Sequence, residues 1–434
     1  MNYQESLAYL DSLGKFGIRL GMERIEGLLR ELGNPEQQIK TIHVTGTNGK
    51  GSVSSMITNI LLAANLKTGK FTSPHLVKYN ERITINGQDI DDDSFADLLT
   101  IVKTAADSVV AKGVCEQPTQ FEVLTAAAFL YFALENVDYA VIEVGMGGLW
   151  DSTNVITPIV SVITNVSLDH TDRCGKTVER IAMQKAGIIK ENVPVVTAAE
   201  GDDALGPIKA VAMFKQAKLY IYGRAFWGTE VESSMEGQTF TLHAGEYYSS
   251  DYSIRLPGEH QIANTSVAIV AAKLVSKQDD RINELALHIG VANTVWPGRL
   301  ERIAQAPDVI LDGAHNPAGA EALRKALDKY YPEGKRIFVL GMMGDKDMTG
   351  VISRLIRPMD IVYTVKADDG ARAAAAEELA GLVGVQALAM SSLADAYEAA
   401  VSRADSDSVV CICGSLYLVG NFKNLLLNVK AGCH

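Results

Sequence analysis

The chain of 434 residues has a hydrophobic fraction of 47% and a charged fraction of 21%, which are ordinary values for a folded globular protein. Its length exceeds what a single hydrophobic core usually serves, so two domains are expected. The formal net charge of −12 argues against a nucleic-acid partner and suits an enzyme that binds nucleotides through a few placed cations.

The N-terminal residues contain neither a basic segment nor an apolar core, and no apolar run is long enough to cross a bilayer. The sequence therefore predicts neither a signal peptide nor a membrane partner. Five cysteines are scattered without a C-x-x-C pair, which is typical of free thiols in a reducing compartment. We expect a cytoplasmic protein.

The first predicted elements are two short helices within residues 2–32, where leucine and isoleucine recur at helical spacing. Between them, residues 14–24 carry three glycines and are predicted to form a loop. This loop is either a linker or one wall of a substrate site.

A glycine-rich turn then joins a predicted strand, Ile42–Thr45, to a predicted helix, Val53–Ala64. The turn reads Gly-Thr-Asn-Gly-Lys-Gly-Ser from residue 46 to residue 52. Glycines let the backbone approach an anion, and a helix N-terminus offers free N–H groups to it. Lys50 would add a charge for the outer phosphates of a nucleotide, and Ser52 a hydroxyl for Mg²⁺. The turn is a variant of the phosphate loop, because Gly51 separates the lysine from the serine.

After this helix, Ser73 and His75 lie beside a break at Pro74, and Asn80–Gly87 resembles a short hairpin. Two helices are predicted next, over residues 92–112, opened by a Ser94 cap or an Asp-rich first turn, and over residues 119–135.

Two buried strands carry polar groups at their C-terminal ends. The strand from Asp138 ends at Glu143, a position that suits a Mg²⁺-organising carboxylate or a cap for a neighbouring helix. The strand Pro158–Thr164 leads to Asp169 and His170. In the helix predicted over 178–189, Lys185 has apolar neighbours. Its amine either extends to solvent or is buried with a lowered pKa.

Further strands at 193–198 and 219–222 complete an alternation that predicts a doubly wound parallel sheet. Residues 227–256 read as an antiparallel appendage, and a helix runs from 258 to 277. Pro297 and Gly298 mark a domain boundary, so we expect an N-terminal domain over 1–296 and a smaller α/β domain over 297–434.

The second domain repeats the strand–helix alternation, with polar residues at each junction. Its strands are predicted at 309–311, 336–340, 361–364, 385–388 and 408–413, with helices near 317–330, 347–356, 373–382, 392–403 and 416–427. Ligands of such sheets bind at the C-terminal ends of strands, so a cleft between the domains is expected. Since the sequence lacks hydrolase and dinucleotide motifs, these residues indicate an ATP-dependent transferase or ligase.

Nine motifs in this order resemble the folylpolyglutamate synthase / dihydrofolate synthase family of the Mur ligase superfamily. They are 46–52, Thr72-Ser-Pro-His75, Glu81-Arg-Ile83, Glu143–Gly148, Asp151–Asn154, Leu168–His170, Gln184–Lys190, Gly298–Glu301 and Leu311–Pro317. The resemblance spans nearly the whole chain. It implies an α/β fold with a P-loop ATPase-like first domain and a Rossmann-like second domain, and an enzyme that acts as a monomer.

The resemblance also implies the reaction. A carboxylate of a reduced folate or of dihydropteroate would be phosphorylated by ATP, and L-glutamate would displace the phosphate to form an amide. Two Mg²⁺ ions are implied, held by Ser73, Glu143 and His170, with Ser73 favoured over Ser52 as the hydroxyl ligand. Lys185 matches a carbamylated lysine (N6-carboxylysine) and Arg299 a phosphate-neutralising residue, so Lys50, Lys185, His170 and Arg299 are the implied catalytic group.

The remaining implied contacts fall into two sets. For ATP they are Thr47, Asn48, Gly49, Lys50, Gly51, Ser52, Asn264, Arg299, Asp312 and His315. For the folate or pteroate they are Arg19, Leu20, Gly21, Thr119, Gln120, Phe121, Glu122, Trp150, Asp151 and Ser152.

One departure concerns the first substrate. Bacterial bifunctional relatives usually read Gly-Gly-Arg-Leu-Asp-Ala-Thr-Asn, whereas this chain has Leu149 and Trp150 after the glycines. Trp150 either stacks on a pterin ring or belongs to the core. Two rival functions remain open, a sister Mur-type ligase for another carboxylate and a nucleotide-binding regulatory or assembly module.

Overall fold

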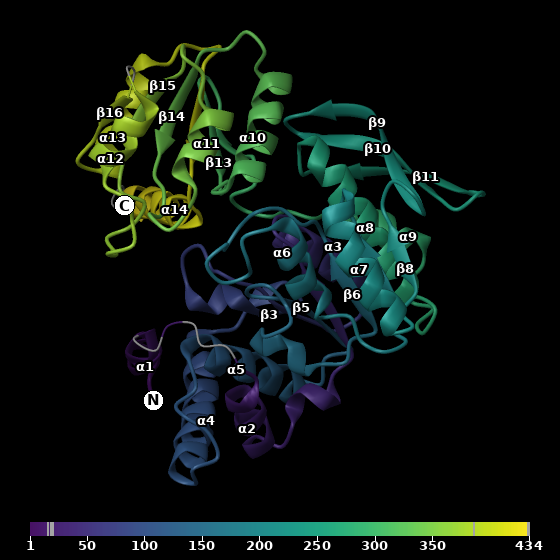
Figure 1. Cartoon of the computed structure of the whole chain (residues 1–434). Helices are drawn as coiled ribbons and strands as arrows, with labels where there is room; N and C mark the ends of the chain where they lie inside the picture. Colours follow the sequence, from purple (N-terminus) through teal and green to yellow (C-terminus); the bar gives the residue numbers. More distant parts are fainter. Residues whose placement is uncertain (15–16, 18–20, 385–386, 432–434) are drawn as a thin grey trace.

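The computed structural model describes the backbone of residues 1–14, 17, 21–384 and 387–431, and side chains as far as residue 427. Two large sheets lie one above the other in the view of Figure 1, with a small three-stranded sheet beside the upper one. The expected α/β class with a mostly parallel first sheet is confirmed.

The first sheet has eight strands in the order β4-β3-β2-β5-β1-β6-β7-β8. Strands β2 to β8 in this order pair in parallel, whereas β3 and β4 form the antiparallel hairpin expected near Asn80. The bounds are β1 Thr41–Thr45, β2 Thr68–Phe71, β3 Ile83–Ile85, β4 Gln88–Asp89, β5 Tyr139–Glu143, β6 Val160–Ile163, β7 Val195–Thr197 and β8 Leu219–Ile221.

Helices cover both faces of this sheet, and β5 shows why. Its residues alternate between two cores: Tyr139 and Val141 belong to one cluster, Ala140 and Ile142 to the other. The helices are α1 Tyr3–Leu13, α2 Glu23–Glu31, α3 Lys50–Ala63, α4 Asp92–Ala111, α5 Gln120–Leu134, α6 Val178–Ala186, α7 Asp202–Phe214, α8 Glu259–Val275 and α9 Glu284–Ala292, with short 3₁₀ turns η2 Pro35–Gln38, η3 Tyr79–Arg82 and η4 Ser152–Val155.

Three details differ from expectation. Helix α3 begins at Lys50, inside the glycine turn, because Gly49 adopts the left-handed conformation that starts it. Helix α4 has the Asp-rich first turn that was one of the two alternatives, and its cap is Asp91, whose carboxylate accepts the Ser94 N–H, and not Ser94 itself. Helix α9 has no counterpart among the predicted elements.

The appendage is the antiparallel sheet β9 Phe226–Ser234, β10 Gly237–Ala244 and β11 Tyr248–Ile254. Phe240 and Tyr252 on its inner face join the same core as α3 and α8, which fixes it to the first sheet's helices.

The second large sheet has the order β12-β13-β17-β14-β15-β16, with all pairs parallel except β12–β13. Its strands are β12 Glu301–Ala304, β13 Asp308–Asp312, β14 Arg336–Leu340, β15 Ile361–Thr364, β16 Ala387–Ala389 and β17 Val409–Cys413, and its helices are α10 Pro317–Tyr330, α11 Met348–Leu355, α12 Ala376–Val383, α13 Leu393–Arg403 and α14 Leu416–Ala431. The antiparallel edge strand β12 was not expected. The boundary between residues 296 and 297 stays a prediction.

Candidate active site

The glycine turn after β1 is held in a fixed shape by the chain around it. Gly49 has φ +81°, and a Cβ there would lie 2.6 Å from Asn264 Oδ1 on α8. The Thr164 hydroxyl donates to the Asn48 carbonyl (2.6 Å), and the Asn48 N–H donates to Asn165 Oδ1 (2.9 Å). The turn and the N-terminus of α3 therefore form a rigid anion-binding geometry.

Lys50 folds back over this turn. Its Nζ donates to the carbonyls of Gly46 (3.0 Å) and Thr47 (3.2 Å). Burial lowers the pKa of Lys50, while the charges of Glu143 and Asp169 oppose that shift. The Lys50 amine is thus fixed at the mouth of the turn.

Glu143, at the end of β5, points a carboxylate at the same place. It is 4% exposed, and its Oε2 has no hydrogen-bond partner among the described residues. Burial raises the pKa of Glu143 to about 7, against the charge of Lys50 and a hydrogen bond from the Ser73 backbone. Ser73 lines a cavity together with Glu143, whereas Ser52 lines a different one beside Asn48. The structure therefore brings Ser73, and not Ser52, into one cavity with the carboxylate.

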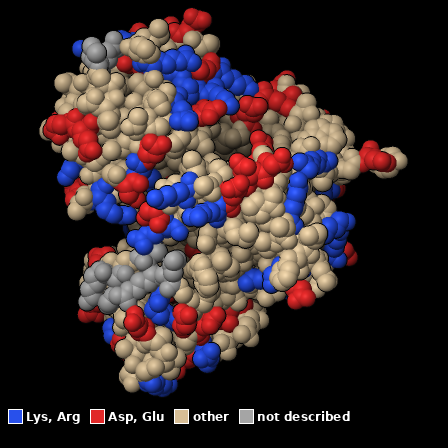
Figure 2. All heavy atoms as spheres, in the orientation of Figure 1, with Lys and Arg blue, Asp and Glu red and all other residues tan. Residues whose placement is uncertain are grey.

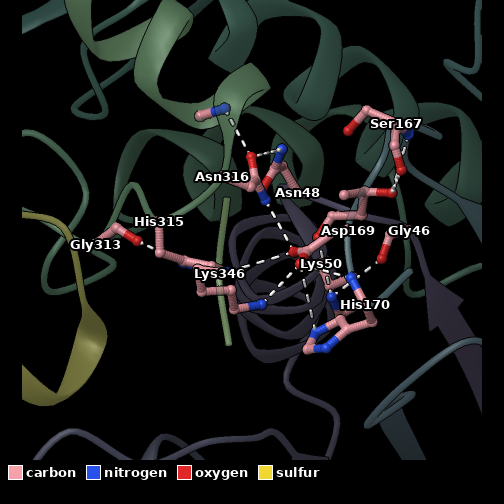
Figure 3. A network of polar contacts seen from close by, with 12 residues as sticks. Gly46, Asn48, Lys50, Ser167, Asp169, His170, Gly313, His315, Asn316 and Lys346 are labelled. Carbon is pink, nitrogen blue, oxygen red and sulfur yellow. Dashed lines mark hydrogen bonds and ion pairs between the residues drawn. The ribbon is translucent and has the colours of Figure 1, made fainter. Parts of the chain in front are cut away.

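The loop after β6 places Asp169 and His170 against the second sheet (Figure 3). The Asp169 carboxylate binds Lys346 Nζ (2.7 Å) and Asn316 Nδ2 (2.9 Å), and lies 3.5 Å from His315 Nε2. Burial would raise the pKa of Asp169, but the hydrogen bond of His315 and the charge of Lys346 hold it well below its usual range. Asp169 is therefore an ionised hub that joins the two sheets.

His170 neighbours this hub with a left-handed backbone, φ +48°. Burial lowers the pKa of His170 to about 4, with Asp169 opposing the shift. The imidazole is thus neutral at physiological pH, which is the form that binds metals.

Lys185 on α6 is 4% exposed, so its amine does not extend to solvent. Among the described residues it has no hydrogen-bonding or ion-pair partner that would balance its charge. Burial, and secondly the charge of Lys50, lowers its pKa to about 7. A substantial fraction of this amine is unprotonated, and therefore nucleophilic, near neutral pH.

Besides the cavity of Ser73 and Glu143, two further cavities lie near these residues. The first cavity is lined by Ser73, Arg82, Thr119, Phe121, Trp150, Asp151, Ser152, His170 and His315, and, from the second sheet's side, by Met343, Lys346, Arg372 and Tyr417. On the face drawn in Figure 2, Lys and Arg side chains gather where the upper and lower parts of the molecule meet. The predicted cleft is therefore present and carries basic groups despite the acidic composition.

The residues predicted for the first substrate are placed unevenly around this cavity. Trp150 is 47% exposed and lines the cavity, so it is not a core residue. Gln120 instead donates to the Leu10 carbonyl and the Tyr79 hydroxyl, and Glu122 pairs with Arg24 at 3.0 Å.

The other predicted contacts of this set have mixed positions. Asp151 lines the cavity, but its carboxylate accepts from the N–H groups of Met146 and Thr153 and so holds its own loop. Gly21 has φ +125° and precedes α2. Arg19 and Leu20 lie outside the described residues.

The second cavity lies on the other side of the glycine turn. Most of the predicted nucleotide contacts are here: Asn48, Gly49, Ser52, Asn264, Arg299 and Asp312. Asp312 accepts from the N–H groups of Leu300 and Ala314 at 2.8 Å each, which fixes the chain beside Arg299. His315 lies in the first cavity instead, since its Nδ1 contacts the Gly313 carbonyl and its ring turns toward Asp169.

Asp169, Asn316 and Lys346 were not among the predicted site residues. All three follow predicted strands, and Asp169 and Asn316 also lie within two of the nine motifs, 168–170 and 311–317. Among the described residues, no helix is long and apolar enough to cross a membrane.

Comparison with known proteins matches residues 44–272 to the Mur ligase middle domain and residues 298–416 to the Mur ligase glutamate ligase domain. The folylpolyglutamate synthase of Lacticaseibacillus casei is 37% identical, over 99% of this chain and 100% of that protein. The dihydrofolate synthase/folylpolyglutamate synthase of Bacillus subtilis is 35% identical, over 98% of this chain and 99% of its own length. A structure of E. coli FolC in complex with DHPP and ADP superposes with a TM-score of 0.89 at 29% identity, covering 99% of both chains.

Proposed function

The chain belongs to the folylpolyglutamate synthase / dihydrofolate synthase family of the Mur ligase superfamily, and on this premise we propose that it is an ATP-dependent ligase that joins L-glutamate to a folate-type carboxylate. One observation carries the proposal. Ser73 and His170 line the first cavity, whose wall includes Phe121 and Trp150, and they lie beside Lys50 and Glu143 at the glycine turn. A cavity with aromatic side chains in its wall thus lies beside the groups that surround the glycine turn.

The proposed reaction has two steps. An oxygen of the acceptor carboxylate attacks the γ-phosphorus of ATP, the bond to ADP breaks, and an acyl phosphate forms. The amine of L-glutamate then attacks the acyl carbon, phosphate leaves and the amine loses a proton. The cleft holds both partners away from water, which limits hydrolysis of the acyl phosphate.

We assign ATP to the second cavity and the glycine turn. Backbone N–H groups of residues 49–52 and Lys50 would hold the β- and γ-phosphates, while Asn264 and Asp312 hold the nucleoside part. Arg299 lies close enough to Glu143, Lys50 and Asp312 for its charge to affect their pKa values. Its guanidinium is suited to stabilise the negative charge that develops during phosphoryl transfer.

The residues present fit Mg²⁺. Three groups can serve as ligands of a divalent cation. They are the Glu143 Oε2 atom, which has no hydrogen-bond partner among the described residues, the Ser73 hydroxyl and the neutral His170 ring. Among the described residues, His, Cys, Asp and Glu form no group of three that would hold a metal alone, which agrees with a site that substrate phosphates and water complete. When bound, Mg²⁺ would stabilise negative charge on the transferring phosphoryl group.

We further propose that Lys185 carries a carbamate. Its amine is buried and has a pKa near 7 because of burial, so it is available to react with CO₂. The resulting anion would offset the charge of Lys50, which is the second cause of the lowered pKa. This interpretation accounts for a lysine that neither reaches solvent nor finds an anion.

For the acceptor, the wall formed by Phe121 and Trp150 suits a flat heteroaromatic ring. The relative from Bacillus subtilis is named for both dihydrofolate synthase and folylpolyglutamate synthase activity, and the E. coli structure contains DHPP. We propose that reduced folates are acceptors and that dihydropteroate is a second acceptor. The second proposal requires that the change to Leu149 and Trp150 in the motif still allows dihydropteroate to bind.

Two alternatives have weaker support. A sister ligase for another carboxylate would share Lys50, Glu143 and Lys185, but the full-length relatives favour folates. A regulatory nucleotide-binding module would not need the aromatic first cavity. We also propose that the protein is a monomer in the cytoplasm. The free thiols of Cys115, Cys174, Cys411 and Cys413 are compatible with a reducing compartment.

The test is ADP release by the purified protein with MgATP and L-glutamate, given dihydropteroate or tetrahydrofolate separately. Turnover with both means a bifunctional enzyme, and turnover with folate alone means a dedicated polyglutamylating one. ADP release that needs neither acceptor nor glutamate would contradict the ligase proposal.

A further inference from the structure

Arg82 enters the first cavity from a position that the backbone fixes. It is the last residue of η3, and the following residue, Ile83, pairs with Phe71 of β2. The Arg82 carbonyl accepts the Thr72 N–H at 3.0 Å. Because Thr72 precedes Ser73, the side chains of Ser73 and Arg82 line the same cavity as neighbours.

The guanidinium is oriented by two rings. Arg82 Nε donates to His75 Nδ1 at 2.9 Å, and the guanidinium carbon lies 5.4 Å from the centre of the Tyr79 ring. Because Nδ1 of His75 accepts this hydrogen bond, the ring is an acceptor for the guanidinium and not a competing cation. The His75 and Tyr79 rings are themselves 4.4 Å apart. The hydrogen bond of the Nε–H group thus fixes the orientation of the guanidinium and leaves its other four N–H groups available.

No acidic side chain neutralises this group. Among the described residues, no carboxylate forms a salt bridge with Arg82, and its Nη atoms have no hydrogen-bond partner. The nearest candidate in sequence, Glu81, is occupied, since its carboxylate accepts the N–H groups of Leu76 (2.7 Å), Val77 (2.8 Å) and Lys78 (2.7 Å). Glu143 interacts with Arg82 only by long-range electrostatic attraction, without a hydrogen bond or an ion pair. A sheltered guanidinium without an anion is costly unless a ligand supplies one.

The other cations of the first cavity are engaged or exposed. Lys346 binds Asp169, Arg173 binds Asp172 at 3.1 Å, and Arg372 is exposed. Arg82 is the partly buried cation of this wall whose donors face no acidic partner, and it lies beside Ser73, where the acceptor must meet the phosphate-binding turn.

We propose that Arg82 binds a carboxylate of the acceptor substrate through its Nη groups and so sets that carboxylate against the glycine turn. This inference rests on the proposed function. The planar fork of donors matches the two oxygens of a carboxylate. His75 and Tyr79 act as positioning residues for the fork. The carboxylate is either the one that reacts, which dihydropteroate and folates share, or the second one, which the terminal glutamate of a folate adds.

Binding experiments with Arg82→Met and Arg82→Lys test the inference. We would measure, by calorimetry, the affinities of dihydropteroate, of tetrahydrofolate and of a dihydropteroate analogue without its carboxyl group. We expect Arg82→Met to weaken carboxylate-bearing acceptors about 10- to 100-fold, the usual worth of a charged hydrogen-bonded pair, and Arg82→Lys to recover part of this loss. The analogue without a carboxylate should bind the wild type and Arg82→Met equally, and the KM for ATP should stay within about twofold. A loss for both acceptors assigns the reacting carboxylate, and a loss for tetrahydrofolate alone assigns the second one.

Arg354→Met on α11 is the control, since among the described residues that guanidinium has a hydrogen bond only to the Gly350 carbonyl of its own helix. Equal weakening of the analogue would overturn the inference, because it would show a damaged cavity rather than a lost ion pair. Unchanged affinity of both acceptors for Arg82→Met would overturn it as well. Failure of the wild type to turn over any acceptor would instead contradict the proposed function.

Discussion

Asn48 in the glycine turn and Asn316 at the N-cap of α10 exchange two side-chain hydrogen bonds, 3.1 and 2.9 Å long, across 268 residues of sequence. Asn316 Oδ1 also accepts the Gly319 N–H that starts α10, and its Nδ2 also reaches Asp169. The glycine turn, the loop of His170 and the second sheet therefore form one hydrogen-bonded unit (Figure 3). Changes at this junction should affect both stability and catalysis.

Asp169 and Lys346 form a largely buried ion pair at this junction. Their side chains are 7% and 11% exposed, so removal of one partner leaves a largely buried charge. We expect Asp169→Ala and Lys346→Met each to destabilise the protein by about 3–5 kcal/mol, and the double variant by less than their sum. Denaturant unfolding followed at the second sheet would measure this coupling.

The exposed pair Glu321–Lys325 on α10 is the matched control, with side chains 54% and 67% exposed. Its coupling should be below about 0.5 kcal/mol. Equal coupling in the two pairs would contradict the role given to Asp169.

The contacts of this junction cannot be predicted from the sequence, although most of the strands can. Periodicity and turn residues predict the strands of both large sheets except β2 and β12. Gly69, which is typical of a break in regular structure, lies inside β2, and β12 is a short strand whose neighbours carry no alternating pattern. Asp169 was visible at a strand end, but its partner Lys346 is 177 residues away, and only the fold brings them together. Both Trp150 and Glu122 were predicted to contact the first substrate. Trp150 lines the cavity, whereas the carboxylate of Glu122 forms an ion pair with Arg24, and residue type alone could not distinguish these two outcomes.

Lys50→Met should abolish ATP-driven ligation while leaving the fold intact. Its ammonium contacts carbonyls of the glycine turn, so its loss removes a fixed charge where phosphate charge develops. We expect turnover to fall by about 10²- to 10³-fold or more. Because a desolvated cation is replaced by an apolar chain of similar length, the unfolding midpoint should not fall. ADP release and thermal unfolding check both parts, and near-normal turnover would refute the assignment of this turn to phosphate.

Mg²⁺ affinity should depend on pH through Glu143. Its pKa is raised to about 7 by burial, so the metal must displace a proton below that pH. We expect the affinity to fall up to about tenfold per pH unit below 7 and to level off above it, whereas His170, with a pKa near 4, adds no slope there. Calorimetric Mg²⁺ titrations from about pH 6 to about pH 8 would show this. Glu143→Gln should remove the slope, and a slope that persists in that variant would assign it to another group.

Trp150→Ala should weaken the acceptor and spare ATP. Trp150 is half-exposed on the wall of the first cavity, where loss of aromatic stacking costs about 0.5–1.5 kcal/mol beyond its buried area. The KM for folate should rise roughly tenfold, with the KM for ATP unchanged. Trp227 on β9, 41% exposed and away from both cavities, is the control. A similar loss in Trp227→Ala would point to a global effect.

Lys185→Ala tests the carbamate directly. If the missing group is an anion, short carboxylic acids should diffuse into the space left by the side chain and restore part of the activity. Lys185→Arg fills that space with a permanent cation and should not respond. Since the amine must be unprotonated to take up CO₂, wild-type activity at fixed CO₂ should also fall as the pH drops below about 7, the pKa of Lys185. ADP release with and without added acetate measures the rescue. Equal activity of Lys185→Ala at all acetate concentrations would argue against the carbamate and leave the ligase assignment in place.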